Sequence, residues 1–251
     1  MMLNLRSATR KILETVEEKT GKSVQLMQDD NLAVLATLQM ARHGAGFHIL
    51  RYKPTNDPLD YLITFQAGYV LRLYDAPPNQ RFDLISTHEA HDKARNLLAL
   101  ENPTADSSLV DAFAEKLATW ALMSLRSIPV GMRIDHWIRR TYPDLHAQQD
   151  ASLAQQQQQN VGLLSMNLQG ITVPNKLLGG LAAYALFVDD LTGQNTYSIP
   201  YASSGLLQAG QGLMNVWRNS TDSPEHDCAL VDSWAHAMGI ADWYDWKLFQ
   251  P

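Results

Sequence analysis

The apolar residues of the first hundred positions change between helical and extended spacing. Residues 5–19 carry apolar side chains at roughly helical intervals and Gly21 follows as a stop signal, so we expect a helix there. Extended segments follow at 32–40 and 47–52, and the turn Gly44-Ala45-Gly46 between them predicts a hairpin. The pattern therefore indicates an N-terminal helix and a small antiparallel sheet.

Two more helices are expected before residue 103. Asp57-Pro58 is a favourable helix start, because aspartate can cap free amides and proline is tolerated in the first turn. That helix should run to about Tyr74 and stop before the following prolines. Ser86-Thr87 can cap a second helix that continues to about residue 100. The polar stretch 102–106 then has the composition of a connector.

Beyond residue 103 the apolar spacing is helical almost throughout. A face formed by Val110, Phe113, Leu117 and Trp120 predicts one helix. Ile134, Trp137 and Ile138 mark a shorter one that should end before Pro143. A long segment at 145–166 follows, and further helices are expected at 175–191, 204–218 and 223–238. We therefore predict an α+β fold with two domains: residues 1–103, with helices and a short antiparallel sheet, and residues 104–251, a helical bundle.

Composition and charge restrict the partners and the compartment. The formal charge of -6 opposes a phosphate backbone, so nucleic acid is not expected as a direct partner. Cys228 is the only cysteine, which excludes an intrachain disulfide framework and suits a reducing compartment. The N-terminal residues interleave charges without the apolar run of a signal peptide, and the apolar stretch 177–188 is too short for a bilayer. We expect a cytoplasmic protein without a membrane segment.

The segment 61–72, YLITFQAGYVLR, resembles the active helix of the ImmA/IrrE-like metallopeptidase family, whose pattern is roughly apolar-apolar-A-H-E-x-G-H-x-L. The family belongs to the zincins, so the resemblance implies a small zincin-like N-terminal domain. On this pattern Phe65 and Tyr69 occupy the two histidine positions, and Gln66 occupies the position of the catalytic glutamate. Phenylalanine has no lone pair, neutral tyrosine is a poor zinc ligand, and an amide cannot act as the base.

A second segment, EAHDKARNLL at 89–98, is similar to the family's E-A-N-x-F-A-x-x-L-L and aligns Glu89 with the third zinc ligand. The resemblance covers about residues 20–100. It implies a catalytically inactive relative that binds no zinc and acts as a regulatory or protein-interaction module. The family context implies bacterial stress response or control of mobile elements. The competing interpretation of the 61–72 segment is a plain amphipathic core helix.

Residues 88–92, HEAHD, offer a displaced zinc site as an alternative. On one helix His88 and Asp92 would lie one turn apart with Glu89 beside them, and His91 is a further candidate ligand. A zinc-dependent metallopeptidase using these residues is then the competing function. A polar first turn with surface histidines explains the same residues without a metal.

Two features suggest protein contacts. Arg133, Arg139 and Arg140 surround Trp137 and could receive the acidic patch of a partner, although a solvated helix face is the commoner explanation. The five glutamines at 155–159 cannot all face solvent, so some should meet neighbouring helices or a second chain. A homo-oligomer is therefore an open alternative. A further competing function is a structural assembly subunit whose cleft is filled by Phe65 and Tyr69. The aromatic end at 243–249 is expected to pack internally.

Overall fold

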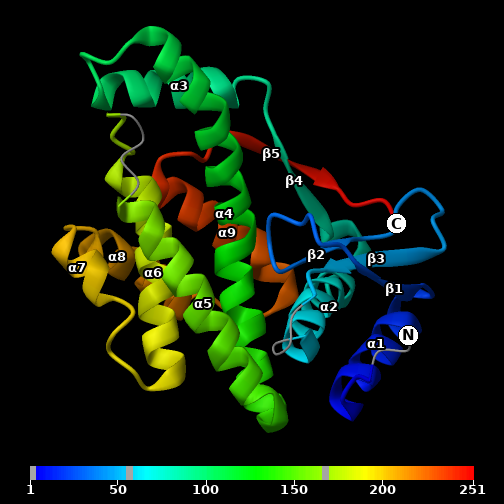
Figure 1. Cartoon of the computed structure of the whole chain (residues 1–251). Helices are drawn as coiled ribbons and strands as arrows, with labels where there is room; N and C mark the ends of the chain where they lie inside the picture. Colours follow the sequence, from blue (N-terminus) through cyan, green and yellow to red (C-terminus); the bar gives the residue numbers. More distant parts are fainter. Residues whose placement is uncertain (1–3, 55–58, 166–169) are drawn as a thin grey trace. The chain divides into compact units, whose positions relative to one another are not determined.

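The computed structural model describes residues 4–54, 59–165 and 170–251 (Figure 1). The chain forms two compact units. Unit 1 comprises residues 1–82, 133–155 and 248–251, and unit 2 comprises residues 83–132 and 156–247. Neither unit is a continuous stretch of sequence. Residues 103 and 104, where the pattern placed a domain boundary, both lie in unit 2.

The described elements combine many helices with short strands, which confirms the α+β class. The α-helices are α1 (Ser7–Thr20), α2 (Leu59–Asp75), α3 (Ala90–Glu101), α4 (Ser107–Thr141), α5 (His146–Ser165), α6 (Asn175–Thr192), α7 (Ile199–Ser203), α8 (Leu207–Asn219) and α9 (Asp227–Met238). The 3-10 helices are η1 (Pro78–Gln80), η2 (Pro143–Leu145) and η3 (Pro224–His226). The strands are β1 (Ser23–Gln28), β2 (Ala36–Gln39), β3 (Phe47–Tyr52), β4 (Phe82–Ser86) and β5 (Tyr244–Leu248).

The N-terminal helix and the hairpin are confirmed. Helix α1 ends at Thr20 because Gly21 adopts the left-handed conformation, with φ 67°, and its amide bonds back to the Glu17 carbonyl. Strands β2 and β3 pair antiparallel, as expected for the hairpin. The prediction of a purely antiparallel sheet is wrong, because β1 adds to the other side of β3 in parallel and gives the order β1-β3-β2.

Helix α2 supplies the centre of the unit 1 core. Its residues Ala67, Val70 and Leu71 pack with Ile12 and Val16 of α1. Figure 1 shows α1 and α2 lying near each other beside the small sheet. The predicted start signal Asp57-Pro58 lies outside the described residues, whereas the predicted end near Tyr74 agrees with Asp75.

Helix α4 is one continuous helix of 35 residues that contains Pro129, so the predicted break before Ile134 is wrong. An internal proline costs about 3 kcal/mol because it removes one backbone hydrogen bond and crowds the preceding turn. Burial along the helix outweighs this cost, since Leu125, Met132 and Ile134 are almost fully buried. The Trp217 indole N–H of α8 also donates to the Pro129 carbonyl at 3.2 Å.

In unit 2, helices α6 and α8 approach each other through small residues. A Cβ at Gly210 of α8 would stand 2.7 Å from Ala182 Cβ and 2.8 Å from the Ala182 carbonyl carbon of α6. Gly179 of α6 meets Ala209 of α8 in the same way, at 3.0 Å. The glycines of the apolar 177–188 stretch therefore serve helix packing.

The aromatic end packs internally, as expected, but it does so as a strand that the pattern did not indicate. Strand β5 pairs with β4 in a two-stranded sheet. The Tyr244 hydroxyl and the Trp246 indole N–H both donate to one oxygen of Asp232 in α9, at 2.5 and 2.8 Å. Burial, and then this hydrogen bond, raise the pKa of Tyr244 well above its ordinary value. The carboxylate thus fixes β5 against α9.

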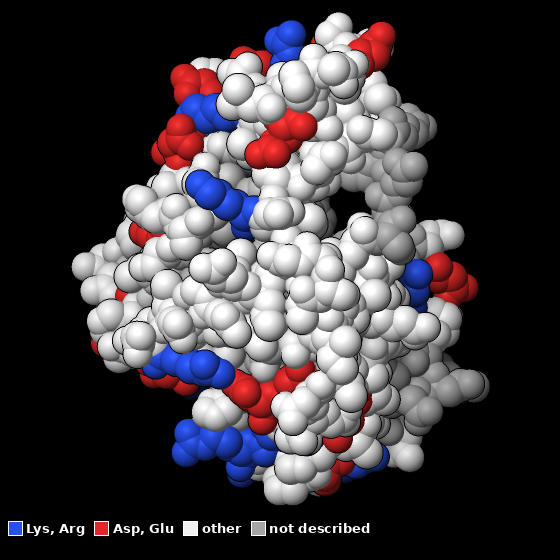
Figure 2. Space-filling view, turned by 90° about the vertical axis from the view of Figure 1, so that its left-hand side faces the viewer, with Lys and Arg blue, Asp and Glu red and all other residues white. Residues whose placement is uncertain are grey.

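The expected burial of part of the glutamine run is confirmed. Gln157 is 1% exposed, and Gln156 accepts a hydrogen bond from the Tyr184 hydroxyl at 3.3 Å. None of the helices in the described part of the chain is both long and apolar enough to cross a membrane. On the face shown in Figure 2, acidic and basic side chains stand in small mixed groups separated by uncharged surface. The described part of that face therefore lacks the basic stripe that follows a nucleic-acid backbone.

Candidate functional site

The three positions of α2 that align with the zincin motif are used for packing. The rings of Phe65 and Tyr69 meet edge to face with centroids 5.4 Å apart, and Phe65 also lies 5.9 Å from the ring of Tyr61. The Gln66 amide donates to the Ala36 carbonyl at 3.3 Å and so ties α2 to β2. The two aromatic rings contact each other along α2 itself, Gln66 bonds α2 to β2, and none of the three presents an imidazole or carboxylate to a metal.

Glu89, the position aligned with the third zinc ligand, forms ion pairs in unit 2. Its carboxylate lies 3.1 Å from the Lys93 ammonium, which also lies 3.1 Å from the Asp242 carboxylate and donates to the Asp242 carbonyl at 2.7 Å. Hydrogen bonds to Asp242 and then to Glu89 raise the pKa of Lys93. Lys93 therefore connects the start of α3 to the turn before β5.

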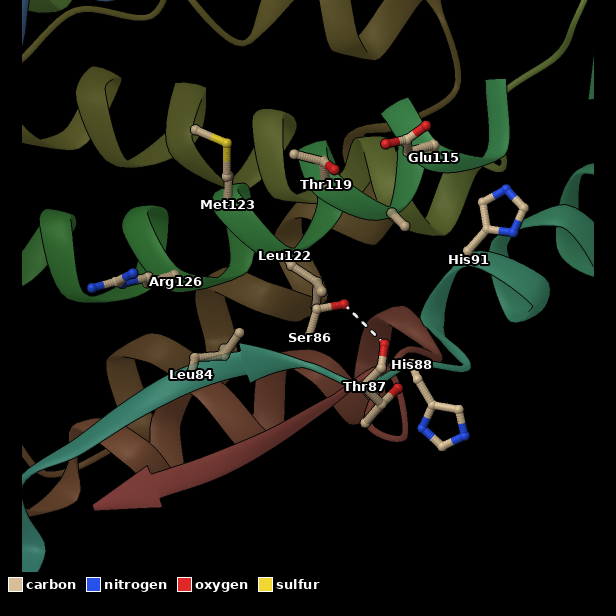
Figure 3. A pocket seen from close by; sticks show the side chains of 11 residues that line it. Leu84, Ser86, Thr87, His88, His91, Glu115, Thr119, Leu122, Met123 and Arg126 are labelled. Atoms are coloured by element: carbon tan, nitrogen blue, oxygen red, sulfur yellow. Dashed lines mark hydrogen bonds between the residues drawn. The ribbon is translucent and has the colours of Figure 1, made fainter. Parts of the chain in front are cut away.

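The alternative zinc site does not have the geometry that the pattern assumed. Helix α3 begins at Ala90, so His88 lies in the preceding turn and is not one helical turn from Asp92. The nearest carboxylate of each histidine is its own neighbour: Glu89 at 3.8 Å from His88, and Asp92 at 3.4 Å from His91. Figure 3 shows the two imidazole rings pointing in different directions. Within the described ranges, no three His, Cys, Asp or Glu side chains gather as metal ligands would.

The expected basic docking cluster is not one exposed patch. Arg133 is 1% exposed, and Trp137 packs against the core of unit 1. Arg139 bonds to the Asp150 carboxylate of α5 at 2.8 Å. Arg140 is the exposed member of the cluster. Helical periodicity places these residues on different sides of α4, which proximity in sequence does not reveal.

A groove of about 300 Å³ lies in unit 2 between β4, the turn after it, and α4. We call it the β4–α4 groove, and Figure 3 shows the side chains around it. It is lined by Leu84, Ser86, Thr87, His88, His91, Glu115, Ala118, Thr119, Leu122, Met123 and Arg126. His88 and His91 of the predicted alternative zinc site line the groove, whereas Glu89 and Asp92 of that site do not.

The groove combines an apolar lining with charged ends. Leu84, Leu122 and Met123 provide apolar surface, and Met123 is 61% exposed. Glu115 and Arg126 lie on α4 eleven positions apart, which is about 16 Å along a helix axis. An exposed methionine beside apolar neighbours is suited to adaptable contacts, because its side chain is flexible and polarisable.

The hydroxyl groups of Ser86 and Thr87 in the groove are not arranged as nucleophiles. Ser86 Oγ donates to the Thr87 carbonyl at 3.1 Å, and Thr87 Oγ1 donates to the Trp243 carbonyl at 3.2 Å. An activated hydroxyl would donate to a base such as an imidazole. Here both hydroxyl protons are donated to backbone carbonyl groups. A carbonyl group accepts the hydrogen bond but is too weak a base to remove the proton. Neither hydroxyl therefore has the base-bonded arrangement of an activated nucleophile.

Sequence reasoning missed the groove because β4 was not expected. The stretch Phe82–Ser86 lies between a proline-rich turn and the residues assigned to a helix start. Its aliphatic and aromatic residues are enough to suggest a short strand, and this is the local signal that was available. No local pattern in the sequence indicates that α4 forms the other side of the groove.

Comparisons of the whole chain with protein-family models, curated proteins and solved structures gave no match.

Proposed function

We propose that this chain is a catalytically inactive, metallopeptidase-like protein that works as a regulatory protein-interaction module, with the β4–α4 groove as its binding site. The observation that carries the proposal is the groove itself: an open apolar surface flanked by Glu115 and by Arg126, which lies 4.0 Å from the Asp83 carboxylate. The Ser86 and Thr87 hydroxyl groups are engaged by backbone carbonyls. The regulatory setting, bacterial stress response or control of mobile elements, follows from the sequence resemblance.

The roles of the α2 side chains support the non-catalytic part of the proposal. Phe65 and Tyr69 pack against each other and Gln66 bonds to a backbone carbonyl. Restoring ligands there would require replacing two rings that contact each other along α2 and the amide that bonds α2 to β2. The lining of the groove supports the binding part, since about 300 Å³ is at the lower end for small-molecule pockets and accommodates one or two apolar side chains of a protein segment.

The competing zinc peptidase is tested by elemental analysis. The full chain is purified without chelator or histidine tag, then incubated with zinc, desalted and measured again. We expect metal far below one atom per chain in both samples. Near-stoichiometric zinc that disappears in His88→Ala or Asp92→Ala would overturn the proposal and revive the displaced site.

The binding role is tested by site-specific photo-crosslinking in the source cells. A photoreactive residue replaces Met123 in the groove, and a matched variant carries it at Leu100, which is 79% exposed and does not line the groove. We expect a crosslinked partner from position 123 that is missing from position 100. Identical products from both positions would show that the groove has no selective partner.

A further inference from the structure

The pairing of β4 with β5 determines which backbone groups of β4 point away from β5. The Thr87 amide donates to the Trp243 carbonyl at 3.0 Å, and the Phe249 amide donates to the Arg81 carbonyl at 2.7 Å. Both bonds fit one antiparallel register across the two strands. Because such ladders alternate, the odd-numbered residues of β4 direct their amide and carbonyl groups toward β5.

Leu84 and Ser86 therefore direct their amide and carbonyl groups to the opposite edge of β4. The β4–β5 sheet contains two strands, and the described residues add no further strand beyond β4. Leu84 and Ser86 are also the residues of β4 that line the groove. An open strand edge thus borders the apolar surface of the groove.

We propose, resting on the proposed function, that the groove binds an extended segment of a partner protein, which adds to β4 as a third strand. The backbone of the segment pairs with Leu84 and Ser86, and one apolar side chain enters the space between Leu84, Leu122 and Met123. A basic residue of the segment faces Glu115. An acidic residue faces the half-exposed Arg126 side chain, and shares its guanidinium with Asp83, whose carboxylate lies 4.0 Å away. At about 3.3 Å per residue, a strand of about five residues spans the 16 Å between these charges.

The open edge selects a strand over a helix as the occupant. A helical segment satisfies its own backbone groups, so it would cover the edge of β4 without supplying partners for it. A strand supplies those partners and places alternate side chains toward the apolar surface, which is how peptides add to sheet edges in general. The opposite charges at the two ends provide selection among apolar strands.

Two fluorescent pentapeptides are the probes for the full-length protein. Each has a central leucine flanked by threonines. One peptide begins with lysine and ends with glutamate, and the other begins with glutamate and ends with lysine. We expect one order to bind more tightly in an anisotropy titration. N-methylation of the amides that face β4 should weaken binding at least tenfold, because it removes hydrogen bonds to the strand edge and adds a steric conflict there.

Charge reversal gives the matched test of orientation. Glu115→Lys should weaken the preferred peptide and strengthen its reversed counterpart, whereas Glu101→Lys should change neither. Glu101 is a suitable control because it is exposed at the end of α3 and does not line the groove. Equal effects of both variants would overturn the charge assignment, and no binding of either peptide at about 1 mM would overturn the proposal.

Amide hydrogen exchange separates this inference from the proposed function. Peptide binding should slow exchange at Leu84 and Ser86. Selective crosslinking at position 123 with unchanged exchange at these two amides would overturn strand addition and leave the binding role in place. Failure of both measurements would remove the proposed function as well. Protection that rises with protein concentration without peptide would assign the edge to a second copy of the chain and overturn the inference.

Discussion

Gly68 of α2 lies directly against Ile134 of α4: a Cβ at position 68 would stand 2.5 Å from Ile134 Cγ2. Both residues belong to unit 1, and Ile134 is 1% exposed. The glycine that contributes to the resemblance with the metallopeptidase helix therefore has a packing role of its own. Its presence in this chain does not require a metal site to explain it.

Gly68→Ala should lower the free energy of unfolding by about 1–3 kcal/mol, because the added methyl overlaps a buried side chain. Urea denaturation of the purified variant measures this. The double variant Gly68→Ala, Ile134→Ala should lose less than the sum of the two single losses, since truncating Ile134 removes the overlapping atom. Strict additivity would show that the overlap is relieved in some other way.

A second glycine contact has a matched control in the same helix. Gly210→Ala should destabilise by at least about 2 kcal/mol, because its Cβ would meet the backbone of α6 at 2.8 Å, where no rotamer change can make room. Gly212 of α8 has nothing within 4 Å of a built Cβ. Gly212→Ala should therefore stabilise by about 0.5–1 kcal/mol through helix propensity. Thermal unfolding of both variants is the measurement, and equal shifts would contradict the α6–α8 packing.

Local signals predicted the elements whose causes are local. Gly21 ends α1 by its own conformation, and the turn at 44–46 joins two strands that are adjacent in sequence. Strand β1 was missed because it depends on a parallel pairing with β3, in which Leu26 stands opposite Leu50. Parallel pairing needs residues distant in sequence, so the six residues of β1 carry only a weak pattern by themselves.

The candidate site was harder to predict than the fold for the same reason. Thr87 bonds to Trp243, so the edge of β4 exists only because a segment over 150 residues later pairs with it. The groove also needs Leu122 of α4 opposite Leu84. The predicted docking cluster failed at Arg133, because arginine is usually exposed but this residue is buried. Charge type alone is therefore a weak guide to a docking surface.

Asp189 should contribute far more to stability than its neighbour Asp190. The Asp189 carboxylate accepts hydrogen bonds from the amides of Thr196, Tyr197 and Ser198 and from the Ser198 hydroxyl, at 2.6 to 3.0 Å. It is 5% exposed, so these bonds fix the loop after α6.

Asp189→Ala should cost about 2–4 kcal/mol in the free energy of unfolding, because several charge-assisted bonds to a buried carboxylate are lost at once. Asp190→Ala removes an exposed ion pair with Arg218 and should cost less than about 1 kcal/mol. Urea denaturation of the two variants side by side gives the comparison. A similar cost for both would mean that the loop is not held by the carboxylate.

His48 should make the protein less stable as the solution becomes acidic. It is fully buried in β3, where its Nδ1 accepts the Ala41 amide at 3.0 Å and its Nε2 lies 3.2 Å from Thr20 Oγ1. The Nδ1 atom therefore carries no proton, and Nε2–H donates to the threonine. Burial, and then the charge of Lys22, lower the pKa of His48 below its ordinary 6.5.

The sign of the pH effect follows from proton binding. Between the lowered folded pKa and the unfolded value of about 6.5, the unfolded chain binds a proton that the folded protein excludes. The His48 contribution to stability is complete above pH 6.5 and declines as the pH falls below it. Unfolding titrations from pH 8 to pH 5 should show this decline, and His48→Gln should flatten it, whereas substitution of exposed His43 should not. An NMR titration of the His48 ring with a midpoint at or above 6.5 would contradict the buried neutral imidazole, because the folded state would then gain rather than lose stability on acidification.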